Sequence, residues 1–308
     1  MPRPDFAVSR AGHVARMLVL DAAAVEVIDA LAQSGVRTVL LKGPSISRWV
    51  YEDGEFRSYS DLDLLVAPAD VRRAVRTLTG LGFDRVHSDA HAELLRRARD
   101  QVTVDLHRVL VGVQARPEEA WSVLIDSTQA FALQGREVEI LPEPARALHL
   151  ALHAAQHGAH DSKPLDDLAI ALDRLPESVW EGAAALAGRL HASAAFGTGL
   201  RLLPKGREIA ERLDLPQERS VEMALRAGTP PPTALGVYRF VTTPGVRAKA
   251  SLLAGELFPS VAFMRAWSPV ARRGPVGLTA AYLWRPIWLL LRVGPALRAW
   301  QRARRTTN

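Results

Sequence analysis

The sequence contains no cysteine, which excludes a disulfide framework and any metal site built from thiolates. It has no run of about 20 uncharged apolar residues either, so we expect no helix that spans a membrane. The opening segment, MPRPDFAVSR, lacks the apolar core of a secretory signal. These absences favour the cytoplasm, a reducing compartment, as the location of the protein.

Acidic residues are absent from the last part of the chain. After Glu256 there is no Asp or Glu, whereas nine arginines follow. The rest of the chain holds 30 basic and 33 acidic residues, so the net charge of +6 originates in this tail. A basic tail on a nearly neutral body does not predict a general nucleic-acid-binding surface.

The tail interleaves its arginines with Trp284, Trp288 and Trp300. One interpretation is peripheral contact with an anionic membrane. The other is a helix that packs on the core and leaves its arginines in water. Pro286 and Pro295 predict that this region is not one continuous helix, because proline removes a helical hydrogen bond.

The length of 308 residues and the hydrophobic share of 48% predict a globular protein with about two domains. Hydrophobic periodicity predicts an α+β fold, with strands and helices in the first region and helices after it. We expect region boundaries at 1–142, 143–228 and 229–308, the last being helical, basic and rich in Trp and Arg.

The first region is expected to be irregular over residues 1–16 and then to alternate between helices and strands. The periodicity and the Gly and Pro positions predict helices at 17–34, 43–52 and 68–83, strands at 36–42, 61–67 and 100–110, and a hairpin at 131–141. In the second region the expected helices are at 143–160, 163–174, 178–192 and 205–227.

Carboxylates occur inside two of the predicted strands. In the segment DLDLLV, Asp61 and Asp63 are two residues apart, so their side chains lie on the same face of the strand. They would destabilise each other unless a divalent cation lay between them. Asp105 in VTVDLH is a third acid with apolar neighbours on another predicted strand. Three such acids predict a Mg²⁺ site of the kind that acts on phosphate substrates.

The segment before these acids predicts a site for phosphate. The predicted strand 36–42 ends at Gly43, where a helix begins, and a helix start directs backbone N–H groups at an anion. Ser45 adds a hydroxyl group and Lys42 a positive charge. A lysine that closes an apolar strand is otherwise an ordinary residue whose stem is buried and whose head reaches water.

These motifs resemble those of a known superfamily. The order Gly-x-Ser at a helix start, Asp-x-Asp on a strand and a later isolated Asp on another strand resembles the polymerase-beta-like nucleotidyltransferases. More narrowly, LLKG, SDLDLLV, LGF and VDLH resemble an uncharacterised bacterial nucleotidyltransferase family over roughly residues 20–175. The resemblance implies an α/β catalytic domain of the nucleotidyltransferase type with a small mixed sheet, followed by a helical substrate domain.

The resemblance also implies an activity and a set of site residues. The reaction would be transfer of a nucleotidyl group from an NTP to an acceptor, with two Mg²⁺ ions, or Mn²⁺, and release of pyrophosphate. Asp61 and Asp63 would hold both metals and Asp105 would complete the catalytic one. Gly43 and Ser45 would contact the triphosphate.

The sequence departs from the superfamily at Pro44, where a Gly or Ser with a backbone N–H is usual. Lys42 would compensate as a charge on the phosphate, or donor binding would be weaker. Arg57 is expected either to bind phosphate or to neutralise Asp61. Two alternative functions stay open: a toxin-like transferase that acts on tRNA, and a non-catalytic nucleotide-binding or scaffold protein that kept the fold.

Histidines provide further candidates on the substrate side. His107 follows Asp105 by two residues and points to the same face, to assist the acceptor, to orient a metal ligand or simply to pack. His149, His153 and His157 are four residues apart on one helix face. They would form a second metal site or, alternatively, line a helix interface. His157 and Asp167 are candidates for contact with the acceptor, which is a small molecule, a peptide or protein, or an RNA.

Overall fold

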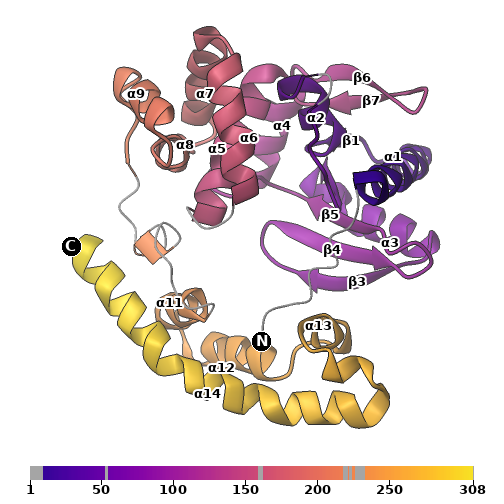
Figure 1. Cartoon of the computed structure of the whole chain (residues 1–308), viewed down its shortest axis with the longest axis vertical. Helices are drawn as coiled ribbons and strands as arrows, with labels where there is room; N and C mark the ends of the chain where they lie inside the picture. Colours follow the sequence, from indigo (N-terminus) through magenta and orange to yellow (C-terminus); the bar gives the residue numbers. More distant parts are fainter. Residues whose placement is uncertain are drawn as a thin grey trace.

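The structure is a computed structural model that describes residues 10–52, 55–158, 162–217, 221, 224–225 and 233–307. Within these residues, seven strands form one mixed sheet, and helices cover both of its faces (Figure 1). A second group of helices covers one face, and a third group forms a layer at one side of the molecule. The predicted α+β class is confirmed. The predicted boundary at residues 228–229 lies outside the described residues.

The sheet has the order β3-β4-β5-β2-β1-β7-β6. Its centre combines a parallel pair, β2 with β5, and an antiparallel pair, β1 with β2. The strands are β1 (Thr38–Leu40), β2 (Leu62–Val66), β3 (Phe83–Ser88), β4 (Ala92–Arg97), β5 (Thr103–His107), β6 (Gln129–Leu133) and β7 (Arg136–Ile140).

The expected strands near 36–42, 61–67 and 100–110 correspond to β1, β2 and β5, and each is shorter than expected. The hairpin predicted at 131–141 is formed by β6 and β7, and its turn residues Gln134 and Gly135 both have positive φ. The hairpin of β3 and β4 was not predicted. Its strands alternate weakly and carry several exposed polar side chains, as strands near a sheet edge do.

The helices of the first region are α1 (Arg10–Gln33), α2 (Pro44–Val50), the 3₁₀ turn η1 (Pro68–Asp70), α3 (Val71–Gly80) and α4 (Pro117–Ile125). Residues 10–16 were expected to be irregular, and this was wrong. The apolar stripe begins near Met17, but Ala and Arg propagate the helix towards the N-terminus. Arg16 also ties this end to the sheet, because its guanidinium donates to the carbonyl oxygens of Asp100 and Gln101, both at 2.7 Å.

The second region contains α5 (Glu143–His157), α6 (Ser162–Arg174), α7 (Glu177–Arg189), α8 (Ser193–Leu200) and α9 (Pro204–Arg212). The helix expected at 205–227 was too long. It ends at Arg212 because Asp214 adopts φ of 47° and Pro216 follows. Helix α8 lies very close to α5, since a Cβ at Gly199 would stand 2.0 Å from the Ala151 carbonyl oxygen.

The C-terminal layer contains α11 (Ala234–Thr242), α12 (Val246–Leu257), α13 (Val261–Trp267), the 3₁₀ turn η3 (Val270–Arg272) and α14 (Gly274–Thr307). The expectation of an interrupted helix was wrong, since α14 runs through both Pro286 and Pro295. The helix lies at the surface, where water can bond to the carbonyls that proline leaves unpaired, and it bends instead of ending (Figure 1). None of the helices in the described ranges combines the length and hydropathy needed to cross a bilayer.

The two faces of the sheet pack against different helices. On one face, Leu40, Leu64 and Val104 join the core formed with α1 and α3. On the other face, Val39 and Leu65 join the larger core formed with α5 and the helices after it. Because side chains alternate along a strand, the odd-numbered positions of β2 and β5 face the helical region.

Candidate functional site

Two of the predicted acids occupy matching positions on adjacent strands. Asp63 of β2 is paired in register with Asp105 of the parallel strand β5. Both are odd-numbered positions, so both side chains lie on the sheet face that the helical region covers. Asp63 is buried and Asp105 is half-buried. The fold therefore brings together acids that are 42 positions apart in the sequence.

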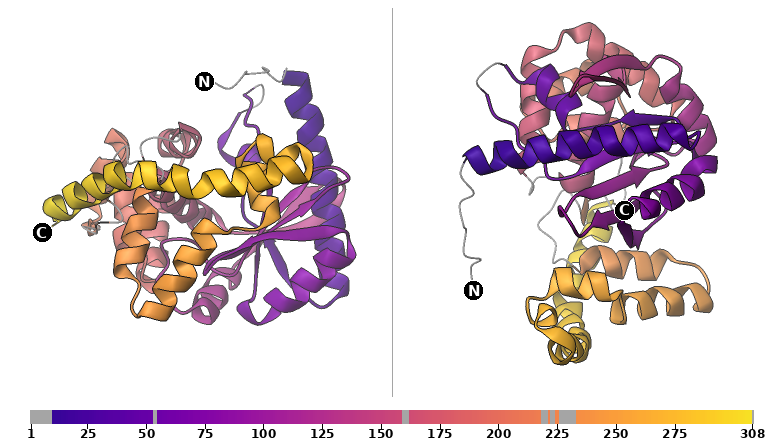
Figure 2. Two further views of the ribbon diagram at one scale, coloured as in Figure 1. Left: turned by 90° about the horizontal axis from the view of Figure 1, so that it is seen from below. Right: turned by 90° about the vertical axis from the view of Figure 1, so that its right-hand side faces the viewer.

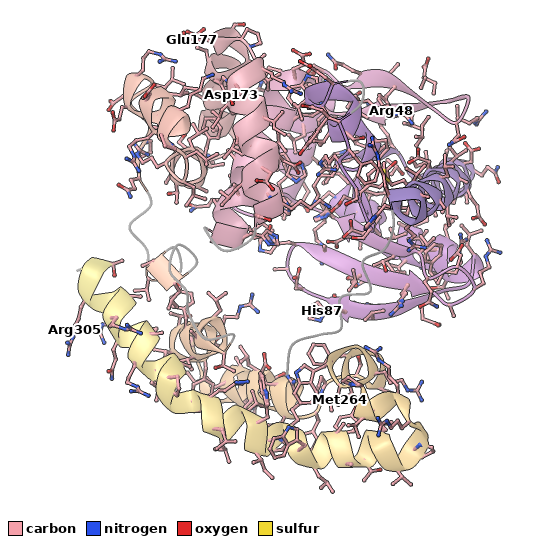
Figure 3. The ribbon with its side chains drawn as sticks, in the orientation of Figure 1. Arg48, His87, Asp173, Glu177, Met264 and Arg305 are labelled. Carbon is pink, nitrogen blue, oxygen red and sulfur yellow. The ribbon has the colours of Figure 1, made fainter. Side chains whose placement is uncertain are left out.

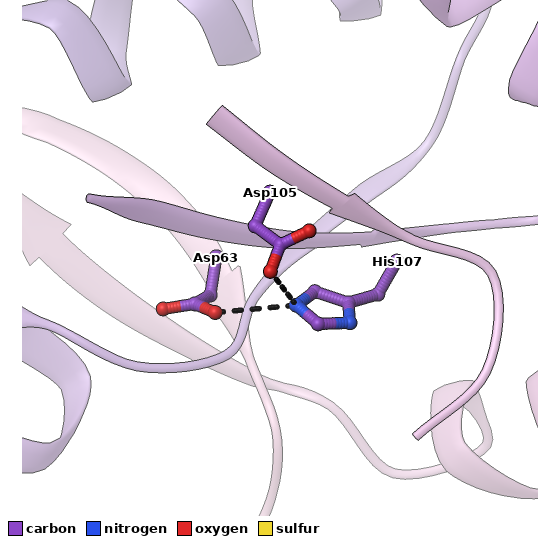
Figure 4. Close-up of side chains that lie close together, drawn as sticks. All are labelled: Asp63, Asp105 and His107. Atoms are coloured by element: carbon purple, nitrogen blue, oxygen red, sulfur yellow. Dashed lines mark hydrogen bonds and ion pairs between the residues drawn. The ribbon is translucent and has the colours of Figure 1, made fainter. Parts of the chain in front are cut away.

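His107 completes this cluster from the end of β5. Its Nε2 lies 3.2 Å from Asp63 Oδ1 and 3.4 Å from Asp105 Oδ2, so that one ring nitrogen contacts both acids (Figure 4). The possible ligand atoms of the three residues all lie within 4.8 Å of one another. The expected shared face of Asp105 and His107 is thus present, and the histidine contacts the acids.

Lys42 lies two residues after the end of β1 and neutralises one of the acids. Its Nζ is 2.8 Å from Asp63 Oδ1, and both side chains are largely buried. Burial alone would lower the pKa of Lys42, but the charge of Asp63 raises it above its usual value. Burial would conversely raise the pKa of Asp63, but Lys42 and His107 hold it well below its usual range. In this structure Lys42 therefore forms an ion pair with a carboxylate, and its expected contact with phosphate stays a prediction.

At the other two acids, burial and repulsion outweigh the effect of the nearby basic groups. Burial raises the pKa of Asp105, and the negative charge of Asp63 raises it further against the opposing effect of His107. Burial and Asp63 also raise the pKa of Asp61, which directly precedes β2. A divalent cation would offset this excess of buried negative charge, and carboxylate oxygens are the ligands that hard cations prefer.

The turn at Gly43 connects β1 to α2. Gly43 has φ of 68°, and a Cβ there would stand 3.4 Å from the Tyr59 ring, so this position favours glycine. Pro44 occupies the first helical turn, where its missing N–H costs little. The Ser45 hydroxyl is buried and donates to the Leu41 carbonyl oxygen at 3.1 Å. In this conformation Ser45 therefore stabilises the turn, and its predicted contact with phosphate stays a prediction.

Arg57 and Asp167 form a buried ion pair with each other. The Arg57 guanidinium donates to both carboxylate oxygens of Asp167, each at 2.6 Å, and the Tyr51 hydroxyl donates to the same carboxylate at 2.7 Å. Arg57 also donates to the Gly43 carbonyl oxygen at 3.5 Å. The pair therefore fastens the Gly43 turn and the segment 55–59 to α6. One interpretation of the sequence had expected Arg57 to neutralise Asp61. In the structure Arg57 forms its ion pair with Asp167 instead.

The three histidines of α5 form a column that leads towards the acids. The ring centroids of His149 and His153 are 6.3 Å apart, and those of His153 and His157 are 4.5 Å apart. His149 is buried, and burial with nearby Lys42 lowers its pKa to about 3. His157 is exposed at the end of the helix. In the described ranges the group of residues that could hold a metal is Asp63, Asp105 and His107, not these histidines.

Lys163 is a site neighbour that the sequence did not reveal. Burial lowers its pKa, Arg57 lowers it further, and Asp61 and Asp167 act in the opposite direction. This places the first turn of α6 beside the acids. A lysine at a helix start carries no recognisable signal, because the spacing to Asp61 exists only after folding.

The comparisons with known proteins concern mainly the first two regions. A family model described as "Uncharacterised nucleotidyltransferase" matches residues 2–205. No curated protein matches the chain significantly.

Similar solved structures include the crystal structure of ANT(2")-Ia in complex with adenylyl-2"-tobramycin, with 15% identity, a TM-score of 0.44, and coverage of 56% of this chain and 98% of that one. They also include the lincosamide antibiotic adenylyltransferase LnuA bound to lincomycin, with 16% identity, a TM-score of 0.36, and coverage of 48% and 94%. A nucleotidyltransferase-like protein from Paracoccidioides brasiliensis has 13% identity, a TM-score of 0.39, and coverage of 66% and 94%. At such identities and scores these likenesses say nothing about a substrate.

Proposed function

Because this chain belongs to the uncharacterised nucleotidyltransferase family, we propose that it moves an NMP group from an NTP to an acceptor hydroxyl or phosphate in a metal-dependent reaction. The membership makes it a nucleotidyltransferase. The metal, the donor and the kind of acceptor group belong to the proposal. Pyrophosphate is the second product, since the bond between the α- and β-phosphates is the one that breaks.

The observation that carries the proposal is the register of β2 and β5. Asp63 and Asp105 are directly paired on parallel strands, with Asp61 two residues before Asp63 and His107 two residues after Asp105. Asp63 and Asp105 share one sheet face and Asp61 lies just before β2. Three carboxylates this close together are unfavourable in the absence of a cation, because burial and mutual repulsion both disfavour ionisation. The clustering of these carboxylates supports a site that binds a metal ion and phosphate together.

We propose that Asp61, Asp63 and Asp105 hold two Mg²⁺ or Mn²⁺ ions. Such ions, when bound, neutralise phosphate oxygens and lower the pKa of an acceptor hydroxyl. Lys42 already neutralises part of this charge through Asp63. If Asp63 binds a metal ion instead, the ammonium group of Lys42 would be released at the same place to bind the phosphates of the donor.

The remaining site residues are proposed to bind and to orient the substrates. The Gly43 turn and Ser45 would contact the triphosphate, and Arg57 would hold that turn in place through its bond to the Gly43 carbonyl. His107, which contacts both acids, would orient them or accept the acceptor's proton. Asp167 would act by fixing Arg57, and His157 would contact the acceptor at the exposed end of its helix. The donor is a cytoplasmic metabolite, and we propose the cytoplasm as the location.

The test combines a chemical readout with a binding readout. Purified protein is incubated with each NTP, MgCl₂ and a cell extract, and pyrophosphate release and labelled products are measured. We expect pyrophosphate with at least one NTP, and no release in EDTA or from the Asp105→Asn variant.

The binding readout is thermal melting with Mg²⁺ and NTP together, separately and absent. A ligand at 100 times its Kd stabilises the folded state by about 2.7 kcal/mol, so the combination should raise the melting temperature where either alone does little. Stabilisation without any product would assign a non-catalytic nucleotide-binding function. Neither stabilisation nor product would contradict the whole proposal.

A further inference from the structure

Helix α14 has two unlike sides along its length. One side is packed against the C-terminal layer through small residues and one arginine, namely Gly277, Ala281, Arg285, Ala296, Ala299 and Ala303. The opposite side is apolar and exposed, with Val276, Leu283, Ile287, Leu290, Leu291 and Leu297. The exposed fractions of Leu283, Leu290 and Leu291 are 71%, 72% and 68%. A contiguous exposed patch of this kind marks an interaction surface.

The exposed side of α14 faces away from the rest of the protein. The helix borders the molecule on the side opposite the second region (Figure 1). Helices α11, α12 and α13 contact α14, and α13 also contacts β3. Seen from that side, α14 crosses the front of the molecule over most of its width (Figure 2). The apolar side chains are therefore presented on an outer boundary and not in a cleft.

Inward contacts fix this orientation of the helix. Arg285 is buried, donates to the carbonyl oxygen and the carboxylate of Glu256, and stacks on Phe263. The Trp288 ring contacts that of Trp267 edge to face, with centroids 5.4 Å apart. Met264 is fully buried between α13 and α14 (Figure 3). The outward face is thus held in place before any partner binds, which reduces the entropic cost of binding.

Arginines continue the outward face towards the C-terminus. Trp284, Leu291, Arg298 and Arg305 are each seven positions apart, so they lie on one stripe of the helix. Trp284 is half-exposed, Arg298 and Arg305 are exposed, and Arg305 projects from the end of α14 (Figure 3). No acidic residue follows Glu256 anywhere in the sequence. The outward face therefore combines apolar side chains, a tryptophan at their margin and uncompensated positive charge.

We propose that this face of α14 binds the surface of an anionic lipid bilayer, with the helix axis parallel to the membrane. Apolar side chains would enter the boundary between headgroups and acyl chains, and the arginines would contact anionic headgroups. Tryptophan is enriched at this depth of a membrane. Charge decides against a second copy of the chain, because an identical helix offers arginines and no carboxylate to pair with them. The inference is independent of the reaction proposed above.

The experiment is flotation of the full chain with vesicles of phosphatidylcholine alone and with phosphatidylglycerol added. We expect binding to the anionic vesicles at low salt, and a large loss of binding at 0.5 M NaCl because salt screens the headgroup charge. Absence of binding to anionic vesicles at low salt would overturn the proposal. Equal binding to neutral vesicles would overturn the role of charge.

Two pairs of variants separate the face from the rest of the surface. Leu283→Asp should abolish binding, whereas Leu18→Asp, at an exposed leucine of α1, should not change it. Arg298→Glu with Arg305→Glu should weaken binding at least about 20-fold, since each basic residue near an anionic surface contributes about fivefold. Arg72→Glu with Arg76→Glu on α3 reverses the same charge elsewhere and should have little effect. All four exchange exposed residues, and circular dichroism checks that they fold.

The oligomeric state in solution tests the alternative in which a second copy of the chain, and not a membrane, covers the outward face of α14. Light scattering of the column-purified chain should give a monomer in the absence of lipid. A dimer that Leu283→Asp dissociates, together with no vesicle binding, would assign the face to a second copy of the chain and overturn the lipid proposal.

Discussion

At the scale of single residues, Asp63 and Asp105 occupy matching positions but different electrostatic environments. Lys42 and His107 hold the pKa of Asp63 below its usual range, whereas burial and the charge of Asp63 raise that of Asp105. The carboxylate of Asp63 therefore stabilises the folded state above its unfolded pKa of about 3.9, and that stabilisation is lost as the pH falls. Ionisation of Asp105, in contrast, costs folding free energy at neutral pH.

Replacing each acid by its amide should affect stability in opposite directions. Without metal at pH 7, Asp105→Asn should leave the free energy of unfolding unchanged or raise it. Asp63→Asn should lower it by about 3–5 kcal/mol, because Lys42 loses the partner of its buried charge. Both variants should lose at least about 100-fold in turnover if the acids hold a metal. Urea denaturation and a pyrophosphate assay measure the two effects.

The sequence alone suggested that both amides would relieve repulsion, since the contact of Lys42 with Asp63 was not visible in it. A fall in stability of both variants would identify both acids as structural ion-pair partners. The control for the ion pair is Lys42→Met with Asp63→Asn, which should recover most of the stability that either change removes.

The buried histidine of the α5 column predicts how stability depends on pH. His149 has its pKa lowered to about 3, below the unfolded value of about 6.5. The unfolded chain therefore binds a proton between these values and the folded chain does not, so stability falls as the pH drops below about 6.5. Between pH 7 and pH 5 this one group should account for about 2 kcal/mol.

His149→Phe should make the free energy of unfolding less dependent on pH over this range. The matched control is His87→Phe, at the exposed histidine of β3 that is labelled in Figure 3. Denaturation curves at pH 7, 6 and 5 measure the difference. An identical pH dependence for the protein and His149→Phe would contradict the assigned burial.

At the scale of secondary-structure elements, the sequence predicted the strands that carry the acids but not their neighbours. β2 has a continuous and β5 an alternating apolar pattern, each with a carboxylate at one position. Such a pattern identifies a strand without knowledge of the elements that pack against it. The β3–β4 hairpin was missed because it is stabilised by pairing with β5 and not by its own periodicity. Packing of α14 through its own Arg285 and against Met264 of α13 outweighs the cost of two prolines. Helix propensities of single residues take no account of such tertiary packing.

The ion pair of Arg57 with Asp167 predicts strong coupling between the Gly43 turn and α6. Arg57→Met should cost about 3–5 kcal/mol, because the buried carboxylate of Asp167 would lose its ion-pair partner and keep the hydrogen bond from the Tyr51 hydroxyl. Adding Asp167→Asn should recover a large part of this loss. Arg37→Met is the control, since Arg37 also pairs with a carboxylate, Glu139, but both side chains are about 40% exposed. It should cost less than about 1 kcal/mol in urea denaturation.

At the scale of the whole molecule, the site is assembled from three parts of the chain. The segment after β1 contributes Lys42, and β2 contributes Asp63. β5 contributes Asp105 and His107, and the helical region covers the same sheet face. Asp61, Asp63 and the Gly43 turn were predictable because their spacing along the chain is local, and Asp105 was predictable because it interrupts the apolar pattern of its own strand. Contacts such as that of Lys42 with Asp63, or of Arg57 with Asp167, depend on distances that arise only when the chain folds.

The burial of β2 implies that the protein opens in stages. All five residues of β2 are buried between β1 and β5. The C-terminal layer is held by two small clusters, composed largely of alanines, with Met264 and Leu225. Less apolar area is buried there, so this layer should open at a lower free energy than the sheet.

Amide hydrogen exchange followed by mass spectrometry would resolve these stages. Peptides from β2 and β5 should exchange last, with protection equal to that of global unfolding, and peptides from α14 should exchange earlier. Equal protection of α14 and β2 would mean a single cooperative unit. With staged opening, Asp63 and Asp105 would keep their register while the C-terminal layer unfolds and refolds. A substitution that destabilises that layer would then leave the pairing of the two acids intact.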